Sequence, residues 1–523
     1  MTLGEALVTL LEAHGVDTVF GIPGVHTIEL YRGLAGSTIR HVTPRHEQGA
    51  GFMADGYARV SGKPGVVFVI TGPGLTNTLT AMAQARADSV PMLVISGVNA
   101  RPTLGQGLGY LHELPDQRGM TDLVALYSQR VEESRALPPA LRRAFSVFAS
   151  GRPGPVHIEI PLDVMALPAD GLVAEPVAAR PPALDPGYAV EVARRAEVCQ
   201  RPLILAGGGA KRADAALTAL AEKLDAPVVT TTNGRGLLCS HPLGVPASPS
   251  LEAVRSLMAG SDLVIAAGTE FGPTDYDMYA NGRFVLPGNL VRIDIDRWQL
   301  SRRPASMSIL ADAGEAVAAI AGSIDKQASR GGARRAEEAR IAARGELLPY
   351  MLDQLDWVEA IRNALPHAIV VGDSTQPVYA ANLYYDHDRP GGWFNAATGY
   401  GALGYAAPAA VGAALAAPRA SVVCLTGDGG FQYTLAELGS AVEAGVPIAF
   451  VVWNNRGYRE IESAMIEAGV EPIGVKPVPP DFRHIAAAWK VPYGRAASPA
   501  ELGDRLRGWR ATGGVALVEI QVD

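Results

Sequence analysis

Short runs of apolar residues alternate along the chain with longer segments whose apolar residues recur at helical spacing. The runs are rich in β-branched residues, are apolar at consecutive positions, and end in glycine-rich or polar turns. Continuous apolar strands are typical of sheets that helices cover on both faces. The clearest runs are VVFVITGPG (66–74), PMLVISG (91–97), PLILAGGG (202–209), LVIAAGT (263–269), AIVVGD (368–373), SVVCLTGDGG (421–430) and PIAFVVWNN (447–455). The pattern predicts an α/β protein built from doubly wound parallel sheets.

Two segments interrupt this alternation. Residues 165–187 are rich in Ala and Pro and have no periodicity, whereas residues 327–346 are dense in Arg, Ala and Glu. We interpret both as connections between domains, the second of them helical. The chain is thereby divided into three predicted α/β domains, at residues 1–165, 185–325 and 345–523.

Composition excludes several classes of protein. The 523 residues include 45 Lys and Arg against 53 Asp and Glu, so the net charge of −8 gives no reason to bind nucleic acid. The longest apolar stretch, 404–417, contains Pro408 and is shorter than the ~20 residues that cross a bilayer. The N-terminus has no signal-peptide pattern, so we expect a cytoplasmic protein. Cys199, Cys239 and Cys424 lie far apart, which argues against a disulfide framework or a zinc site.

The strongest chemical signal is a possible metal site in the third predicted domain. One strand runs into Asp428-Gly429-Gly430, and the next strand ends at Asn455, 27 residues further on. Because a single crossover returns the chain in parallel, both polar side chains should lie at the carboxyl edge of the sheet. An Asp carboxylate, an Asn amide oxygen and the carbonyl of Gly457 are hard ligands of the kind Mg²⁺ prefers. Gly429 and Gly430 would let a diphosphate approach the backbone at a helix start.

The helix between these strands carries its own start and stop signals. Thr434 and Glu437 have the spacing of a capping box, and Gly445 is expected to end the helix. These signals favour a single crossover. On these residues alone, a purely structural role for Asp428 and Asn455 in closing turns remains open.

These motifs resemble those of the thiamin-diphosphate-dependent enzymes, in which GDG is followed one crossover later by NN. Further similar segments are FGIPG (20–24), GPG (72–74), GRPGPVHIEIPLDV (151–164), VVTTTNGRG (228–236), IDID (293–296) and GALGYAAPAAVGA (401–413). The resemblance implies thiamin diphosphate and Mg²⁺ as cofactors. It also implies a pyrimidine-binding first domain and a diphosphate-binding third domain from different subunits, and hence a homodimer or homotetramer with active sites between subunits.

Glu47 is the leading catalytic candidate. It begins an apolar helix in the segment PRHEQGA, which is similar to the acetolactate synthase and 2-oxo acid decarboxylase branch of the family. The resemblance implies that Glu47 shares a proton with the pyrimidine nitrogen N1′, and burial is expected to raise its pKa. Without the resemblance, a Glu in a first helical turn is more often a partner of the helix dipole.

The same resemblance assigns other cofactor contacts. Gly401 would offer its carbonyl to the 4′-amino group, and Leu403 would be the apolar residue that imposes the bent shape of the cofactor. On its own, Leu403 reads as an ordinary core leucine. Further cofactor-binding positions implied are Thr375, Gln376, Gly457 and Tyr458.

Departures from the acetolactate synthase pattern bear on the reaction. Leu111-His112-Glu113 stands where those enzymes have Phe-Gln-Glu, and residues 270–273 replace an arginine motif of the middle domain. Both changes weaken the expectation of carboligation and make FAD unlikely by resemblance. His112 aligns with a proton-transferring histidine of pyruvate decarboxylases, and a neutral imidazole suits that role near pH 7. Val25, however, stands where those decarboxylases carry an acidic residue, so the proton relay is incomplete by that template.

Within the family the chain resembles the 5-guanidino-2-oxopentanoate (2-ketoarginine) decarboxylases, through GIPGVHTIELYRGL, LHELP and GTEFGPTDYDMY. A guanidinium substrate needs a carboxylate placed to pair with it. Ile461 occupies the place of the catalytic Glu of pyruvate decarboxylases, which leaves its neighbour Glu460 as a displaced candidate. The acidic candidates for substrate binding are Glu113, Glu270, Asp275, Asp277, Glu460 and Glu462.

The sequence therefore favours a non-oxidative decarboxylase that converts a 2-oxo acid to an aldehyde and CO₂. An acetolactate synthase-like carboligase is the alternative with the same cofactors, and a cofactor-binding protein without activity is a third reading. The GGG at 207–209 lacks the rest of a dinucleotide fingerprint, which argues against a nicotinamide dehydrogenase and leaves nucleotide binding by the middle domain open.

Overall fold

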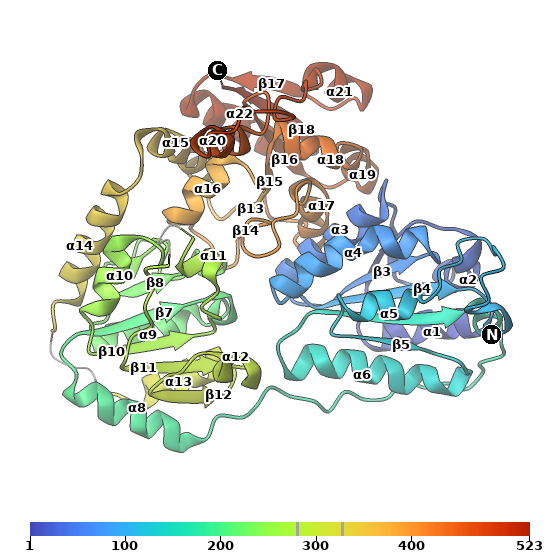
Figure 1. The fold of residues 1–523 in the computed structure, drawn as a ribbon, viewed down its shortest axis with the longest axis horizontal. Helices are drawn as coiled ribbons and strands as arrows, with labels where there is room; N and C mark the ends of the chain where they lie inside the picture. Colours follow the sequence, from blue (N-terminus) through green and yellow to red (C-terminus); the bar gives the residue numbers. More distant parts are fainter. Residues whose placement is uncertain (279–281, 326–328, 523) are drawn as a thin grey trace. The chain divides into compact units, whose positions relative to one another are not determined.

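The computed structural model describes residues 1–278, 282–325 and 329–522, which contain three six-stranded sheets with helices packed between and around the strands (Figure 1). The first sheet has the order β2 (Arg40–Val42), β1 (Thr18–Gly21), β3 (Gly65–Val69), β4 (Met92–Val98), β6 (Pro155–Pro161), β5 (Tyr127–Arg130). The second has the order β12 (Met307–Leu310), β11 (Leu290–Asp294), β10 (Leu263–Ala267), β7 (Pro202–Ala206), β8 (Val228–Thr230), β9 (Gly244–Val245). The third has the order β14 (Trp393–Asn395), β13 (Ile369–Gly372), β15 (Val422–Gly427), β16 (Ile448–Asn454), β18 (Val515–Gln521), β17 (Tyr493–Ala496).

Helices connect these strands. In the first third of the chain they are α1 (Leu3–Ala13), α2 (Ile28–Leu34), α3 (Glu47–Ser61), α4 (Pro73–Ala87), α5 (Gln117–Asp122), α6 (Leu137–Ser150) and α7 (Leu162–Met165). In the middle they are α8 (Pro186–Val198), α9 (Asp214–Leu224), α10 (Glu252–Ala259), α11 (Pro273–Tyr276), α12 (Arg297–Arg302), α13 (Ala313–Ser323), α14 (Gly332–Gly345) and α15 (Pro349–Ala364). In the last third they are α16 (Gln376–Leu383), α17 (Ala406–Ala416), α18 (Asp428–Tyr433), α19 (Glu437–Ala444), α20 (Arg459–Glu467), α21 (Phe482–Ala488) and α22 (Pro499–Thr512). Short 3₁₀ turns are η1 (Val25–Thr27), η2 (Arg101–Thr103), η3 (Ser134–Ala136), η4 (Gly208–Ala210) and η5 (Thr232–Gly234).

The predicted fold class is confirmed. The paired strands run parallel, and every apolar run that the sequence singled out forms a strand, among them β3, β15 and β16. Their side chains are buried along the whole strand, as expected for strands covered on both faces. Cys424, in the middle of β15, is fully buried.

The chain forms two compact units. Unit 1 comprises residues 1–180, 399–494 and 512–523, and unit 2 comprises residues 181–398 and 495–511. Each of the three predicted domain segments contains one of the six-stranded sheets. The described part of the segment 327–346 contains the predicted helix, α14, while residues 327 and 328 lie outside the described residues. Among the helices that the structure describes, none is both long and apolar enough to cross a membrane.

Within unit 1, helices α3 and α17 pack with their backbones in contact. A Cβ atom at Gly56 of α3 would lie 2.0 Å from the carbonyl oxygen of Ala409, and one at Gly412 of α17 would lie 1.8 Å from that of Met53. Only glycine permits so close an approach. The helix that begins with Glu47 is thereby held against the helix that follows the Gly401–Leu403 loop.

Candidate functional site

The structure brings Asp428 and Asn455 together at one edge of the third sheet. Strands β15 and β16 are parallel neighbours, with Gly427 opposite Trp453, so the residue after each strand emerges at the same edge. Both side chains are buried, and the backbone N–H of Asn455 donates a hydrogen bond of 3.3 Å to Oδ1 of Asp428. Asp428 is also the first residue of α18, as expected for a helix start beside a phosphate site.

The electrostatics of Asp428 suit a bound cation. Burial raises the pKa of its carboxyl group, and hydrogen bonds from backbone N–H groups, including those of Asn455, Gly429 and Gly457, oppose this rise. These amides offset only part of the cost of burying the negative charge of Asp428. A cation bound at the carboxylate would offset the rest. No cluster of three or more His, Cys, Asp or Glu side chains with metal-ligand geometry occurs among residues 1–278, 282–325 and 329–522. The buried Asp428 carboxylate and the Asn455 amide oxygen are donors that fit a hard cation whose remaining oxygens come from elsewhere, such as a diphosphate.

Two glycines shape the backbone around Asp428. A Cβ atom at Gly429 would lie 2.5 Å from the ring of Tyr458. Gly457 has a φ of +153° and a Cβ atom there would lie 2.4 Å from the carbonyl oxygen of Val475, so a side chain would be strained and obstructed. The N–H of Tyr458 donates to that same carbonyl at 2.8 Å. The predicted segment Gly457-Tyr458 is thus fixed beside the metal candidates, and Gly430 is buried within α18.

Glu47 lies at the first position of α3, as predicted. Its side chain is half-buried, and Asn77 of α4 donates a hydrogen bond of 3.0 Å from Nδ2 to Oε2 of Glu47. His46 caps the helix by accepting the N–H of Gln48 at 3.1 Å. This arrangement fixes one carboxylate oxygen through a neutral amide.

Glu437 holds the backbone just before Glu47, a role that differs from the one predicted from the sequence. Glu437 does not form the predicted capping box with Thr434, because α19 begins at Glu437 with Ala436 as its N-cap. Oε1 of Glu437 instead accepts the backbone N–H groups of Arg45 at 3.0 Å and His46 at 3.2 Å. Burial raises the pKa of Glu437, and hydrogen bonds from Ser440 and from these amides lower it. Gly445 ends α19 in a left-handed conformation, as predicted.

The Gly401–Leu403 loop is held on two sides. Gly401 is exposed with a φ of +77°, and Leu403 is half-buried. The N–H of Ala402 donates to Oε1 of Gln84 in α4 at 3.2 Å, and the hydroxyl of Thr434 donates to the carbonyl of Gly404 at 2.8 Å. This second bond explains why Thr434 is not available as a helix cap.

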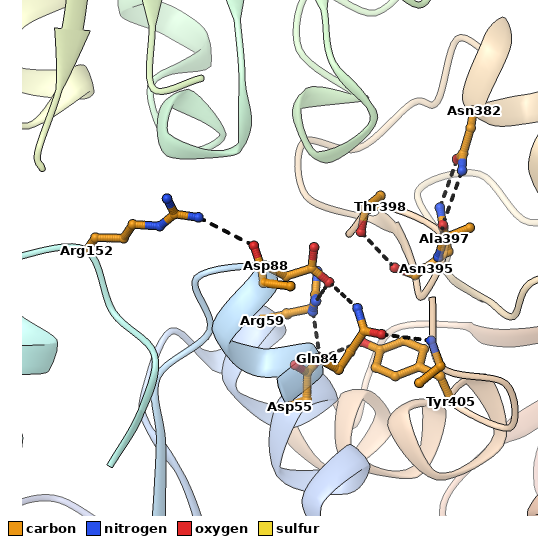
Figure 2. A network of polar contacts seen from close by, with 12 residues as sticks. Asp55, Arg59, Gln84, Asp88, Arg152, Asn382, Asn395, Ala397, Thr398 and Tyr405 are labelled. Atoms are coloured by element: carbon orange, nitrogen blue, oxygen red, sulfur yellow. Dashed lines mark hydrogen bonds and ion pairs between the residues drawn. The ribbon is translucent and has the colours of Figure 1, made fainter. Parts of the chain in front are cut away.

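Gln84 belongs to a buried set of polar side chains that we call the Arg59 network: Asp55, Arg59, Gln84, Asp88 and Tyr405 (Figure 2). Arg59 donates to Asp55 and to Asp88, each at 2.6 Å, and Gln84 donates to Asp88 at 2.7 Å. The hydroxyl of Tyr405, next to α17, donates to Asp55. The network thus joins α3, α4 and the loop before α17. The sequence signal for it was a carboxylate and an arginine four residues apart in an otherwise apolar helix.

His112 and His26 meet in the first predicted domain. Their rings lie edge to face, with centroids 5.2 Å apart and planes at 83°. His26 is buried. Burial is the main cause that lowers its pKa, and the nearby His112 lowers it further. Val25, at the start of η1, is 61% exposed. The sequence reasoning named His112 and Val25 and missed His26.

Thr375 and Gln376 lie in unit 2. Thr375 is the buried residue before α16, and Gln376 is the first residue of that helix. The preceding turn is closed by a hydrogen bond of 2.9 Å from the N–H of Ser374 to Oδ1 of Asp373. Their contact with a diphosphate stays a prediction.

Several acidic candidates for binding a guanidinium already hold partners within the chain. Glu462, on α20, pairs with Arg459 at 3.0 Å and with Lys476 at 2.8 Å, and these contacts lower its pKa. Glu460, on the same helix, is exposed, as is Glu270 in unit 2. The other three accept backbone N–H groups: Glu113 from Gly107, Gly109 and Tyr110, Asp275 from Thr232, and Asp277 from Gly282 and Phe284.

Family models for thiamine pyrophosphate enzymes match three parts of the chain. The N-terminal thiamine pyrophosphate-binding domain matches residues 1–120, the central domain residues 190–320, and the C-terminal thiamine pyrophosphate-binding domain residues 373–520. A solved structure assigned to a thiamin diphosphate-dependent enzyme from Mycobacterium smegmatis covers all of both chains with a TM-score of 0.83. Its sequence identity is 24%, so this likeness concerns the fold.

Curated relatives match most or all of the chain. A protein named as a probable 2-ketoarginine decarboxylase, from Pseudomonas aeruginosa, is 44% identical over 100% of this chain and 94% of its own length. The large subunit of acetolactate synthase isozyme 1 from Escherichia coli is 31% identical over the same shares of the two chains. An acetolactate synthase large subunit from Corynebacterium glutamicum is 34% identical over 87% of this chain and 75% of its own length. The chain belongs to the thiamine pyrophosphate enzymes, with their N-terminal, central and C-terminal domains.

Proposed function

We propose that this enzyme decarboxylates a 2-oxo acid without oxidation, with thiamin diphosphate and Mg²⁺, and that its preferred substrate is 5-guanidino-2-oxopentanoate. The observation that carries the proposal is the 44% identity over the whole chain to a relative named for 2-ketoarginine decarboxylation. The site residues support it, because Glu47, Asp428 and Asn455 all lie in elements that hold them in place. The product would be a guanidino aldehyde.

Asp428, Asn455 and the carbonyl of Gly457 would hold the Mg²⁺ ion. The buried Asp428 carboxylate and the glycine-shaped backbone beside it support this assignment. The backbone at Gly429 and Gly430 would face the diphosphate at the start of α18. Tyr458, Thr375 and Gln376 are further proposed contacts of the diphosphate.

Bound thiamin diphosphate supplies a carbon nucleophile and an acceptor for the electron pair that CO₂ leaves behind. The part of the chain in this chemistry is to position groups and move protons. Glu47 would hold a proton at the pyrimidine nitrogen N1′, with Asn77 fixing its other oxygen. The carbonyl of Gly401 would accept a hydrogen bond from the 4′-amino group of the cofactor, and Leu403 would pack against the cofactor. His112 would supply the proton that the product carbon gains.

The role of Glu47 is tested by Glu47→Gln, which keeps the hydrogen-bonding shape and removes the acid. We expect CO₂ release to fall by roughly 10²-fold or more while affinity for thiamin diphosphate, measured by fluorescence quenching, changes little. Asp428→Ala should show the opposite pattern, with cofactor affinity lost first. Unchanged turnover in Glu47→Gln would reject its assignment, and wild-type Mg²⁺-dependent affinity in Asp428→Ala would reject the metal site.

Recognition of the guanidinium is assigned to α20, which follows the proposed metal site. Glu460 and Glu462 lie in the first turn of α20. Glu462 pairs with Arg459 and Lys476 within the chain, and Glu460 is exposed. We therefore choose Glu460 as the partner of the guanidinium. We expect Glu460→Gln to raise KM for 2-ketoarginine roughly tenfold and to leave KM for pyruvate unchanged, since a charge-assisted pair would be lost. Equal changes for both substrates would move Glu460 from substrate binding to a general catalytic role.

Carboligation is the second candidate function. The 31% identity over the whole chain to acetolactate synthase isozyme 1 favours it. Acetolactate formed from pyruvate alone would support this candidate. Addition of FAD should leave the activity unchanged if the enzyme is the decarboxylase proposed here, because the residues of the middle domain depart from the pattern that accompanies FAD.

We also propose a homodimer or homotetramer in which each active site takes its pyrimidine-binding side from one subunit and its diphosphate-binding side from another. Mixing inactive Glu47→Gln and inactive Asp428→Ala chains tests this arrangement. Recovered activity after co-expression would support shared sites, whereas no recovery would place both residues in the site of one subunit.

A further inference from the structure

Three buried polar atoms without a hydrogen-bond partner lie close to one another in the first sheet domain. Within the part of the chain that the structure describes, they are Nδ1 of His26, Nδ1 of His112 and Oγ1 of Thr71. A Cβ atom at Gly97 would lie 2.7 Å from the carbonyl oxygen of His26 and 3.3 Å from Oγ1 of Thr71. Since the rings of His26 and His112 are 5.2 Å apart, the three groups form one cluster, which we call the histidine cluster.

Buried polar atoms are normally hydrogen-bonded, because an unpaired one loses its contact with water and gains nothing in return, so the grouping of three such atoms needs a reason. The backbone of His112 is also strained, with a φ of +61° that L residues rarely adopt. The loop holds this conformation through a hydrogen bond of 3.0 Å from Asn99 to the carbonyl of Leu111 and through the contacts of Glu113. Strain of this kind is typical of sites whose geometry serves a function.

One glutamine fixes the two glycines that border the cluster. Gln117 accepts the N–H of Gly72 at 3.1 Å and donates to the carbonyl of Gly97 at 2.8 Å. A Cβ atom at Gly72 would lie 2.5 Å from the carbonyl oxygen of His112, so Gly72 sets the position of that residue. Gly72 and Gly97 are therefore held in place beside the cluster. The unpaired atoms belong to side chains that pack next to these two glycines.

We propose that His26 is the positioning partner of His112 in proton transfer, and that the two rings together hold a single exchangeable proton. This inference rests on the proposed function, in which His112 protonates the product carbon. Two imidazoles this close cannot both carry a charge readily, because like charges repel. His26 would thereby do what the acidic residue at the place of Val25 does in pyruvate decarboxylases.

The proton balance is simple. CO₂ leaves without a proton, and the product carbon gains the single exchangeable proton of the pair from His112. One proton from solvent then recharges the pair, entering at His26 and passing to His112, so the net reaction consumes one proton for each aldehyde formed. No oxidant or reductant is required.

The pairing is tested first without any turnover. In protein labelled with ¹³C at histidine Cε1, the resonances of His26 and His112 should change over the same pH range in the wild type. In His26→Phe, the His112 resonance should change in a single step over a different range. Independent titration of the two histidines in the wild type would overturn the pairing, whatever the activity of the enzyme.

The consequence for the reaction is tested by comparing CO₂ release with aldehyde release. In His26→Phe we expect aldehyde release to slow by roughly tenfold, with first-turnover CO₂ release and KM nearly unchanged. His26→Asn introduces a smaller side chain and should likewise slow aldehyde release without slowing CO₂ release. This variant provides the test if His26→Phe does not fold. His41→Phe, outside the cluster, is the matched control and should alter neither step.

The outcomes separate the two proposals. Equal slowing of both steps in the His26 variants would overturn the role of His26 in proton transfer. Paired titration together with no CO₂ release from any 2-oxo acid would reject the proposed function and retain the pairing.

Discussion

Two buried polar regions of unit 1 differ in how fully their atoms are paired. In the Arg59 network, Arg59 is paired with two carboxylates, and Oδ2 of Asp55 is the atom without a partner among the described residues. In the histidine cluster, each of the three side chains has such an atom. Burial raises the pKa of Asp55 and lowers the pKa of His26, so in both regions it disfavours charge. The Arg59 network is fully enough paired to hold the Gly401–Leu403 loop through Gln84, whereas the unpaired atoms of the histidine cluster lie on the groups for which we propose proton transfer.

The largest expected effect is in the Arg59 network. Arg59→Leu removes the guanidinium that pairs with the buried carboxylates of Asp55 and Asp88, so we expect the free energy of unfolding to fall by about 3–5 kcal/mol. Arg142→Leu is the matched control, because Arg142 pairs with Glu175 on the surface and should contribute at most about 1 kcal/mol. Urea denaturation of the three proteins measures both. Equal losses would remove the contrast between a buried, position-fixing network and a surface pair.

A buried histidine with both ring nitrogens hydrogen-bonded, His157, should make the stability of the protein depend on pH. His157 is buried with both ring nitrogens hydrogen-bonded to Ser96 and Ser128, and burial lowers its pKa from 6.5 to about 3. The unfolded state therefore binds a proton first as the pH falls below 6.5, and stability is lost from there down to about pH 3. Between pH 7 and pH 5 this one residue should remove roughly 2 kcal/mol.

The measurement for this prediction is chemical denaturation of the wild type and His157→Gln in the same buffers at both pH values. Gln can keep hydrogen bonds to both serines and does not titrate. The loss of stability on acidification should be smaller in the variant by about the amount given above. The same pH dependence in both proteins would show that His157 is not held neutral by burial.

Gln84 links the Arg59 network to the proposed cofactor site, so its effect should appear in both stability and binding. Gln84→Met removes the acceptor of the Ala402 N–H and the donor to Asp88. We expect a loss of about 1 kcal/mol in stability and a roughly fivefold loss of thiamin diphosphate affinity. Gln200→Met, on the surface of unit 2, should change neither quantity. Lost stability with full affinity would separate the network from the cofactor loop.

The smallest effect is expected at Val25, next to the histidine cluster. Because its side chain is 61% exposed, Val25→Ala should change the free energy of unfolding by no more than about 0.5 kcal/mol. Thermal denaturation compares it with His26→Asn, which alters a buried neighbour and should lower stability by more. Similar losses would mean that position 25 is covered by something in the working enzyme, such as another subunit.

The sequence predicted the parts of this molecule that depend on local pattern. Strands β15 and β16 follow from their apolar runs, and the meeting of Asp428 and Asn455 follows from one crossover between parallel strands. Gly445 ends α19 because glycine readily adopts the left-handed conformation found there, which the residue type alone predicts.

The contacts that the sequence missed join residues far apart in the chain. Glu437 reaches Arg45 over 392 positions, so its spacing from Thr434 suggested a capping box that the tertiary contact replaces. Likewise, no local pattern around His26 indicates that it meets His112. Buried polar side chains in apolar elements, such as Asp55 and Arg59, were the available sign that long-range partners existed.

The most direct test of this account is the reaction itself. Purified protein with thiamin diphosphate and Mg²⁺ should be offered 2-ketoarginine, pyruvate, 2-oxoisovalerate and benzoylformate in parallel, with CO₂ and product measured for each. We predict that kcat/KM for 2-ketoarginine exceeds that for the other three by roughly tenfold or more and that the product is a guanidino aldehyde. Acetolactate from pyruvate, or no CO₂ from 2-ketoarginine, would contradict the account.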